Sequence, residues 1–270
     1  MSTNDLMNIL KEKADYRFDN FEKIPEWNNL VENVDTESYI QKPIWIWGEK
    51  EYVILFIDLI DSSHLSAEKF KWTVAKIYDY FTQSIIDCVD ETEKYSYIDI
   101  KWDGVFMIYE WEWAIENAFI DAINYRTFFS KYVRNKFSEY WVMLECKSSI
   151  YKDSLLVRKI WNRKFRNEVW AWKLVNTAAK LINYPQNCHP KYPRSPEKSS
   201  YLVLPKKIYD YLKSNHYDSA ILSCCNWKVN LWNQHQIEHW QLSYLESYYV
   251  LEAIWCDLHW DNTISKILTH

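Results

Sequence analysis

The segment YIDIKWDGVFMIYE, residues 97–110, predicts two short strands joined by a tight turn, and this hairpin narrows the folds open to the chain. Apolar residues alternate on both sides of the turn at 101–104, as expected for strands. A turn this short favours Gly, Asn or Asp at its centre, because these residues tolerate positive φ at low cost. Trp102 occupies a centre position instead, and its bulk there calls for an explanation.

The segments around the hairpin alternate between strand and helix patterns. Apolar runs of strand length predict strands, with a buried central strand over EYVILFIDLIDSS, and apolar side chains at helical spacing predict helices. The order strand, helix, hairpin, helix, strand predicts an α/β (α+β) fold of the ferredoxin-like type. The predicted strands lie at 51–63, 141–148 and 154–160, and the predicted helices at 67–91, 114–136 and 173–182.

Three regions are expected along the chain: an N-terminal extension over 1–45, a central domain over 46–183 and a C-terminal extension over 184–270. The stretch 183–200 holds four of the seven prolines, which fits an ordered arm as well as a linker. The extension is therefore expected either to pack on the central domain or to be linked to it. Residues 200–214 predict a further strand followed by a helix.

Charge and apolar patterning exclude several classes of protein. The net charge of −5 provides no general basic field for nucleic acid or an anionic membrane. The polar start lacks the apolar core of a signal peptide, and the longest apolar run, YVILFIDLI, is too short to cross a bilayer. Six irregularly spaced cysteines fit reduced thiols. We expect a cytoplasmic protein without nucleic-acid or membrane partners.

Glycine and tryptophan counts depart strongly from the average. An average chain of this length has about 19 glycines, whereas this one has 2 glycines and 16 tryptophans. The two counts together come close to the ordinary glycine number. Some bacterial lineages read the codon UGA as glycine, whereas a common alternative translation table reads it as tryptophan. We hypothesise that most tryptophans here stand at glycine positions.

The positions of the tryptophans favour this hypothesis over an aromatic carbohydrate- or base-stacking module. A stacking surface would space its rings along strands or a groove, whereas many of these lie where glycine is common. Trp170, Trp232 and Trp255 have apolar neighbours and fit true tryptophans. The tryptophans at turns and element ends are Trp102, Trp111, Trp113, Trp141, Trp161 and Trp227.

Two acidic residues stand out by their position. Asp58 interrupts an apolar strand, where an unpaired carboxylate would cost several kcal/mol to bury. Asp103 lies at the hairpin turn, which a ferredoxin-like sheet places beside that strand. Two carboxylates meeting there could hold a pair of divalent cations about 3.5–4 Å apart, the arrangement used for in-line displacement at phosphorus. Alternatively, Asp58 bonds a backbone amide and Asp103 serves only the turn.

Three segments together resemble the signature motifs of class III nucleotidyl cyclases. FIDLIDSS (56–63), KWDGVFMIYE (101–110) and NEVWAWKLVNTAAKL (167–181) are similar to F-x-D-I-x-G-[FS]-T, K-x-x-G-D and W-G-x-x-V-N-x-A-x-R. Trp102 and Trp172 fall on glycine positions of the family, which accounts for the unusual turn. The third motif and the long C-terminal extension are most similar to the bacterial antiphage pyrimidine cyclases of the Pycsar type. The resemblance implies that 46–183 is a cyclase catalytic domain.

The resemblance implies a metal site and a catalytic pair. Asp58 and Asp103 match the metal-binding aspartates, with the backbone carbonyl of Leu59 as a further ligand, for two Mn²⁺ or Mg²⁺ ions per site. Asn176 matches the residue that orients the ribose. Lys180 replaces an arginine that stabilises charge on the α-phosphate, and it keeps the charge without the rigid fork of donors.

At the base-reading positions the chain departs from the purine cyclases. Asp99 stands in the place of a lysine that helps to select adenine, and Val169 in the place of its acidic partner. An aspartate accepts from a ring N–H or an exocyclic amine, so both uracil and cytosine remain open. Phe56 fits packing against the base or ordinary core packing. Asp61 replaces a family glycine, and aspartate tolerates left-handed backbone geometry better than most residues.

The resemblance also implies a homodimer with shared sites, the metals bound by one subunit and Asn176 and Lys180 supplied by the other. The expected activity is a phosphorus–oxygen lyase reaction that converts UTP to cyclic UMP and pyrophosphate. The product would be a second messenger in antiphage defence, read by a separate effector protein. A cytidylate cyclase, an adenylate or guanylate cyclase, and a non-catalytic nucleotide-binding homologue are the alternatives.

The last sixty residues hold Cys224, Cys225, Cys256 and His259. Their spacing matches no strong zinc pattern, so buried thiols are favoured over a zinc site.

Overall fold

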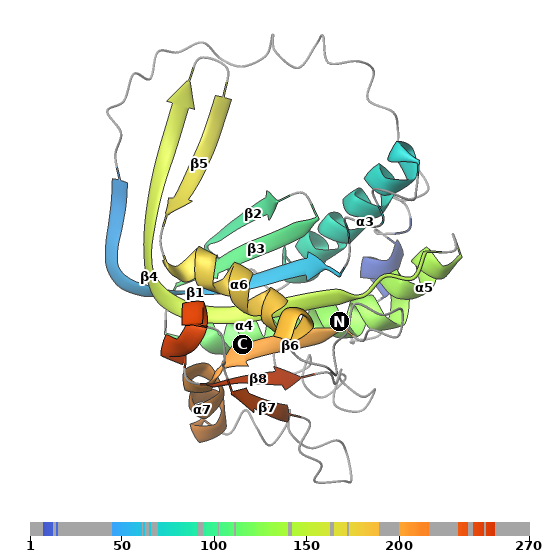
Figure 1. The fold of residues 1–270 in the computed structure, drawn as a ribbon. Coiled ribbons are helices and arrows are strands. Elements are labelled where there is room, and N and C mark those ends of the chain that lie inside the picture. The colour runs from blue at the N-terminus through green and yellow to red at the C-terminus, as the bar shows by residue number, and fades with distance from the viewer. Residues whose placement is uncertain are drawn as a thin grey trace.

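Among the described residues, an eight-stranded mixed sheet forms the centre of the structure (Figure 1). The strand order is β2-β3-β1-β4-β6-β8-β7, with β5 paired to β4 outside this path. The computed structural model describes residues 8–12, 15, 45–60, 62, 65, 70–90, 94–101, 103–110, 112–139, 142–162, 165–171, 173–188, 200–215, 232–236, 240–245 and 247–251.

The strands are β1 Trp45–Leu59, β2 Tyr97–Lys101, β3 Gly104–Tyr109, β4 Cys146–Asn162, β5 Phe165–Ala171, β6 Tyr201–Pro205, β7 Trp232–Gln236 and β8 Ser247–Leu251. The α-helices are α3 Lys71–Asp90, α4 Ala114–Phe128, α5 Arg134–Ser138, α6 Lys173–Cys188 and α7 Lys206–Ser214. A π-helical turn, η1, spans Phe129–Val133 between α4 and α5, and a 3-10 helix, η2, spans Trp240–Leu245.

The two faces of β1 are covered by different helices because successive side chains point to opposite sides of a strand. Val53, Leu55, Ile57 and Leu59 are buried in the main core with side chains of α3 and α4. Ile54 faces the other way, in a second cluster that includes Leu174 and Ala178 of α6. The helices α3 and α4 therefore cover one face of the sheet, and α6 covers the other (Figure 1).

The predicted hairpin is confirmed. β2 and β3 pair antiparallel from Tyr97↔Ile108 to Lys101↔Gly104, and β3 pairs antiparallel with β1. The predicted helix over 114–136 is confirmed as the continuous series α4, η1 and α5. The strand and helix predicted over 200–214 are confirmed as β6 and α7.

Residues 141–162 differ from the prediction of two strands. A single strand, β4, runs over Cys146–Asn162, and β5 was not predicted as a strand. The polar residues Lys152, Asp153 and Ser154 interrupt the apolar pattern, but each keeps a partner in β1, so the ladder continues. β5 pairs antiparallel with the distal part of β4, and Figure 1 shows this pair rising away from the helices.

The strands after residue 200 join the same sheet. β6 pairs parallel with β4 at Lys147↔Tyr201, β8 pairs with β6, and β7 pairs with β8. α6 continues to Cys188, beyond the end of the predicted helix at 182.

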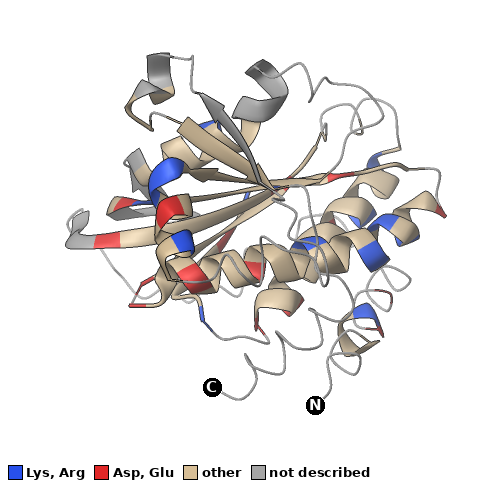
Figure 2. Ribbon diagram, turned by 90° about the horizontal axis from the view of Figure 1, so that it is seen from below, with Lys and Arg blue, Asp and Glu red and all other residues tan. Residues whose placement is uncertain are grey.

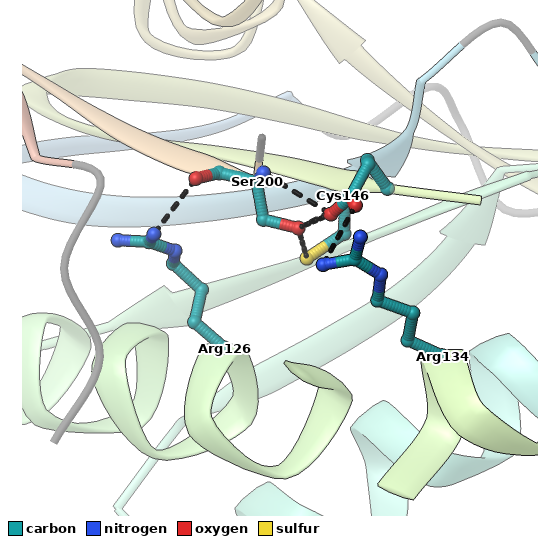
Figure 3. Close-up of polar contacts among 5 residues, drawn as sticks. Arg126, Arg134, Cys146 and Ser200 are labelled. Atoms are coloured by element: carbon teal, nitrogen blue, oxygen red, sulfur yellow. Dashed lines mark hydrogen bonds and ion pairs between the residues drawn. The ribbon is translucent and has the colours of Figure 1, made fainter. Parts of the chain in front are cut away.

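A buried arginine of α4 ties these C-terminal strands to the rest of the fold. Arg126 is 1% exposed and donates to the carbonyl oxygens of Ser200 and Leu251, both at 2.8 Å. The Ser200 hydroxyl donates to Glu145 at 2.6 Å and accepts from the backbone N–H of Cys146 at 3.0 Å (Figure 3). Burial raises the pKa of the Cys146 thiol to about 12, so this cysteine is protonated at neutral pH.

The charged residues carry both signs. In the view of Figure 2, lysines, arginines and acidic residues are interspersed along the described helices, without a broad field of one sign. None of the described helices is long and apolar enough to cross a lipid bilayer.

Candidate functional site

Asp58 lies near the end of β1, between two neighbouring strands. Its partner in β3 is Gly104 and its partner in β4 is Lys147. Alternation along β1 places the Asp58 side chain on the same face as Ile54, the face covered by α6. The acid that interrupts the central strand therefore opens toward α6 and away from the main core.

A buried ammonium group lies against this acid. Lys147 Nζ is 3.1 Å from Asp58 Oδ2, and the two side chains are only 7% and 15% exposed. Lys147 also donates to Asn183 Oδ1 of α6 at 2.6 Å. Burial raises the pKa of Asp58 to about 6, and the Lys147 charge opposes that rise. This end of the sheet thus holds an acid and a cation that have both lost most of their contact with water.

Asp103 joins this pair from the hairpin turn. Its carbonyl oxygen accepts from the backbone N–H of Leu59 at 3.2 Å, which fixes the turn against the end of β1. Its charge also contributes to the raised pKa of Asp58, which is the effect expected of a neighbouring carboxylate. The structure therefore brings Asp58, Leu59 and Asp103 together, as the sequence predicted.

Gly104 leaves the room that the Asp58 carboxylate occupies. A Cβ atom at Gly104 would lie 3.1 Å from Asp58 Oδ1, 3.1 Å from the Ile57 carbonyl oxygen and 3.2 Å from Phe56 Cε2. The close approach of β3 to the acid therefore depends on a residue without a side chain.

The two residues predicted to face the base lie on the same side of the sheet. Phe56 is half-buried and packs edge-on against Phe106, with ring centroids 6.5 Å apart. Asp99 of β2 is opposite Phe106 in the ladder and forms an ion pair of 2.6 Å with Lys101. The carboxylate of Asp99 therefore comes with a neighbouring ammonium group, so this edge presents both an acceptor and a donor.

Asn176 and Lys180 are exposed residues of α6. Leu174, Ala178 and Leu181 are fully buried and form the face of α6 that packs inward. Asn176 and Lys180 lie on the opposite side of the helix. Within one chain they therefore face away from Asp58, and the structure does not bring the predicted catalytic pair to the predicted metal ligands.

Sequence reasoning missed Lys147 and Asn183. Lys147 lies in a run of small and polar residues, Cys-Lys-Ser-Ser, which lacks the apolar contrast that made Asp58 conspicuous. Asn183 lies one residue past the end of the predicted helix. Only the pairing of β1 with β4 places a lysine beside the acid.

The donor set fits hard divalent cations. Carboxylate and backbone carbonyl oxygens are the ligands that Mg²⁺ and Mn²⁺ prefer. The position beside Asp58 already takes a positive charge, that of the Lys147 ammonium group. Among the described residues no three His, Cys, Asp or Glu side chains cluster. Cys224, Cys225, Cys256 and His259, weighed above as zinc ligands, lie outside the described residues.

The fold is found in solved cyclase structures. The guanylyl cyclase Cya2 superposes with a TM-score of 0.56 at 12% identity, covering 77% of this chain and 93% of that one. The adenylyl cyclase CyaB from P. aeruginosa superposes with a TM-score of 0.56 at 12% identity, covering 80% and 99%. The guanylate cyclase domain of RhGC from Catenaria anguillulae gives a TM-score of 0.54 at 8% identity, covering 76% and 98%. The chain has the fold of nucleotidyl cyclase catalytic domains, as predicted.

Two curated proteins named uridylate cyclase are similar in sequence. The protein from Micromonospora echinofusca is 24% identical over 194 residues, which cover 70% of this chain and 59% of that protein. The protein from Propioniciclava tarda is 25% identical over 213 residues, which cover 76% and 65%. The chain thus spans less than two thirds of the length of either relative. No protein-family model matches the sequence.

Proposed function

We propose that this chain is a uridylate cyclase that converts UTP to 3′,5′-cyclic UMP and pyrophosphate. The observation that carries the proposal is the pairing of Asp58 and Asp103 at one end of the sheet, beside the buried ammonium group of Lys147. The cyclase fold and the similarity to two proteins named uridylate cyclase support it.

Asp58, Asp103 and the Leu59 carbonyl would hold two divalent ions. When bound, such ions acidify the ribose 3′-hydroxyl and offset the charge of the triphosphate. The 3′-oxygen gives its proton to water and forms a bond to the α-phosphorus, while the bond from that phosphorus to the bridging oxygen of pyrophosphate breaks. Pyrophosphate leaves with the electron pair of that bond.

Lys147 would take a second position in the loaded site. Divalent ions bound to Asp58 would repel the ammonium group of Lys147. The triphosphate oxygens would attract this ammonium group. The bond to Asn183 gives Lys147 a fixed anchor on α6 during this change. A buried cation of this kind interacts strongly with phosphate because little water screens it.

Asn176 and Lys180 would act on the site of a partner subunit. Both are exposed on the outer side of α6, so a second copy of the chain can receive them. Asn176 would orient the ribose, and Lys180 would stabilise charge on the α-phosphate. Each homodimer would hold two equivalent sites.

Asp99 and Phe56 would contact the base. The carboxylate of Asp99 can accept from the uracil ring N–H, and the adjacent Lys101 can donate to a uracil carbonyl oxygen. Phe56 offers a half-buried ring on the same face of the sheet.

Asp58→Asn and Asp103→Asn test the metal site. Each change keeps the size of the side chain and removes the negative charge, so cyclic UMP formation with Mn²⁺ should fall by about a hundredfold or more. Lys152→Gln is a matched control, because Lys152 pairs with Glu51 in the same sheet away from the site. Full activity of either aspartate variant would overturn the assignment.

Complementation tests the shared site. Asp58→Ala and Asn176→Ala homodimers should both be inactive, whereas a mixture should regain activity, because one composite site of the heterodimer keeps both Asp58 and Asn176. Product formation is followed by mass spectrometry. A mixture that stays inactive while the wild type turns over would rule out the shared site.

The product would serve as a second messenger in antiphage defence, read by a separate effector protein in the cytoplasm. The similarity to Pycsar-type cyclases supports this role. Cells carrying the chain with its neighbouring genes should resist phage lysis, and Asp58→Asn should abolish the resistance. Unchanged resistance in that variant would show that the reaction of this chain is not required for defence.

A further inference from the structure

A segment near the C-terminus packs on the helix that carries Asn176 and Lys180. Leu242 of η2 is 2% exposed and shares a buried cluster with Leu181 of α6. Leu245 packs against this cluster and also against the cluster that contains Leu174 and Ala178. The two leucines hold η2 along the inner side of α6, and Figure 1 shows the two elements side by side.

A hydrogen bond adds a directional contact to this packing. The Thr177 Oγ1 and Tyr244 Oη atoms are 2.6 Å apart, and either can be the donor. Thr177 is 2% exposed, whereas Tyr244 is 45% exposed, so the bond joins the inner surface of α6 to a side chain at the molecular surface. Thr177 and Tyr244 are 67 residues apart in the sequence.

Tyr151 of β4 lies at the same junction. It is 6% exposed and donates to Asp153 Oδ2 at 3.1 Å. Burial is the main reason that its pKa is raised, and Asp153, Tyr244 and Thr177 are all close enough to affect it. β4, α6 and η2 therefore meet in one group of hydroxyls beneath the first turns of α6.

A directional bond at this junction resists rotation of α6 about its own axis. Thr177 follows Asn176 directly and precedes Lys180 by less than one turn. A rotation that breaks the Thr177–Tyr244 bond would move Asn176 and Lys180 together along the surface. Apolar packing alone is non-directional and tolerates such a rotation better than a hydrogen bond does.

We propose that Tyr244 is a positioning residue, which holds α6 through Thr177 so that Asn176 and Lys180 meet the nucleotide bound to the partner subunit. The proposal rests on the proposed cyclase activity and on the shared site. It gives the segment 240–245 a defined part in turnover, although the segment touches no reacting atom.

Tyr244→Phe removes one hydroxyl and leaves the exposed ring in place. Turnover at saturating UTP should fall about tenfold, the scale expected for a modest misplacement of catalytic groups. The melting temperature should stay near that of the wild type. Thr177→Val should reproduce the loss, and Thr177→Ser, which keeps the hydroxyl, should retain activity. Tyr209→Phe on α7 is the control, since it removes the same atom from a tyrosine whose ring stacks on Tyr249 of β8.

Two mixtures identify the half of the site on which Tyr244 acts. Tyr244→Phe with an excess of Asp58→Ala forms composite sites that combine the metal ligands of the first chain with the intact α6 of the second. Turnover per site should then equal that of the wild-type chain mixed with the same excess of Asp58→Ala, because both mixtures combine intact metal ligands with an intact α6. Tyr244→Phe with an excess of Asn176→Ala uses the altered α6, and turnover should remain low.

The outcomes separate the proposal from its premises. Equal turnover in the two mixtures would overturn the positioning role. Wild-type turnover of the Tyr244→Phe homodimer would overturn it as well. Failure of Asp58→Ala and Asn176→Ala to complement would overturn the shared site and the positioning role with it. A wild type that forms no cyclic nucleotide would instead overturn the proposed function.

Discussion

Gly104 shows how a single atom controls the candidate site. An added Cβ would lie 3.1 Å from a carboxylate oxygen of Asp58 and from the backbone carbonyl oxygen of Ile57, so these neighbours would have to shift by a few tenths of an ångström. Gly104→Ala should therefore lower the free energy of unfolding by about 1–3 kcal/mol. Turnover should fall about tenfold or more, because the acid is displaced from its position.

Urea unfolding and a UTP turnover assay check the Gly104 prediction. Ser96→Ala is a suitable control, since Ser96 is exposed just before β2. If Gly104→Ala kept both stability and turnover, neither property would depend on the close approach of β3 to Asp58.

The tryptophans pose a second question at the residue scale. Trp72 and Trp113 lie within the described residues and are 41% and 57% exposed, so neither fills the core. Trp102 and Trp172, which fall on family glycines, lie outside the described residues. A bulky residue where the backbone needs glycine would cost about 1–3 kcal/mol. Several such sites would use up a typical stability of about 5–15 kcal/mol.

Replacing the tryptophans at the hypothesised glycine positions with glycine should therefore raise the stability of the protein. The restored version should be more soluble and melt at a higher temperature than the sequence with tryptophan, as measured by expression yield and calorimetry. Equal solubility and equal melting temperature would count against the glycine hypothesis. The positions to change are Trp72, Trp102, Trp111, Trp113, Trp141, Trp161, Trp172, Trp227 and Trp260.

The residues of the candidate site were partly visible in the sequence. Asp58 was conspicuous because an acid in an apolar strand needs a partner, and the hairpin turn placed Asp103 beside it. The partner of Asp58, Lys147, was not visible, since its own segment resembles a half-exposed strand. Such a contact depends on the register between β1 and β4, which local pattern does not specify.

At the scale of elements, Arg126 makes a polar contact from α4 to Ser200, just before β6, and to Leu251 of β8. Its guanidinium makes two charge-assisted hydrogen bonds to backbone carbonyls in a buried position. Arg126→Met should lower the free energy of unfolding by about 3 kcal/mol or more, because both carbonyls would lose their donor. Urea unfolding at equilibrium measures this loss.

Arg134→Met is the matched control for Arg126. Arg134 is 41% exposed and pairs with Glu145 at 3.1 Å, so its loss should cost less than about 1 kcal/mol. Equal losses for the two variants would show that the Arg126 bonds do not hold the C-terminal strands in place.

The elements themselves were predicted best where the pattern is local and strong. The hairpin and the helix from residue 114 have clear periodicity, and both are present. β4 was divided in the prediction because Lys152 and Asp153 break the apolar pattern, whereas the pairing with β1 overrides it. The role of Arg126 was hidden, because its acceptors lie 74 and 125 residues away in the chain.

At the scale of the whole molecule, the sheet continues past the region that carries the motifs. The order of elements over 46–183 predicted the fold, but the parallel pairing of β4 with β6 joins distant segments that show no shared pattern. The sheet supplies Asp58 and Asp103 on one side of α6, and α6 turns Asn176 and Lys180 outward. Under the proposed function, these two sets of residues are the half-sites that a homodimer would complete.

The most direct test of this account is a competition among substrates. The glycine-restored protein is incubated with Mn²⁺ and equal amounts of ATP, GTP, CTP and UTP, and the cyclic products are quantified by mass spectrometry. We predict that cyclic UMP is the dominant product and that Asp58→Asn abolishes it. Dominant cyclic AMP or cyclic GMP, or no cyclic product from a folded dimer, would contradict the account.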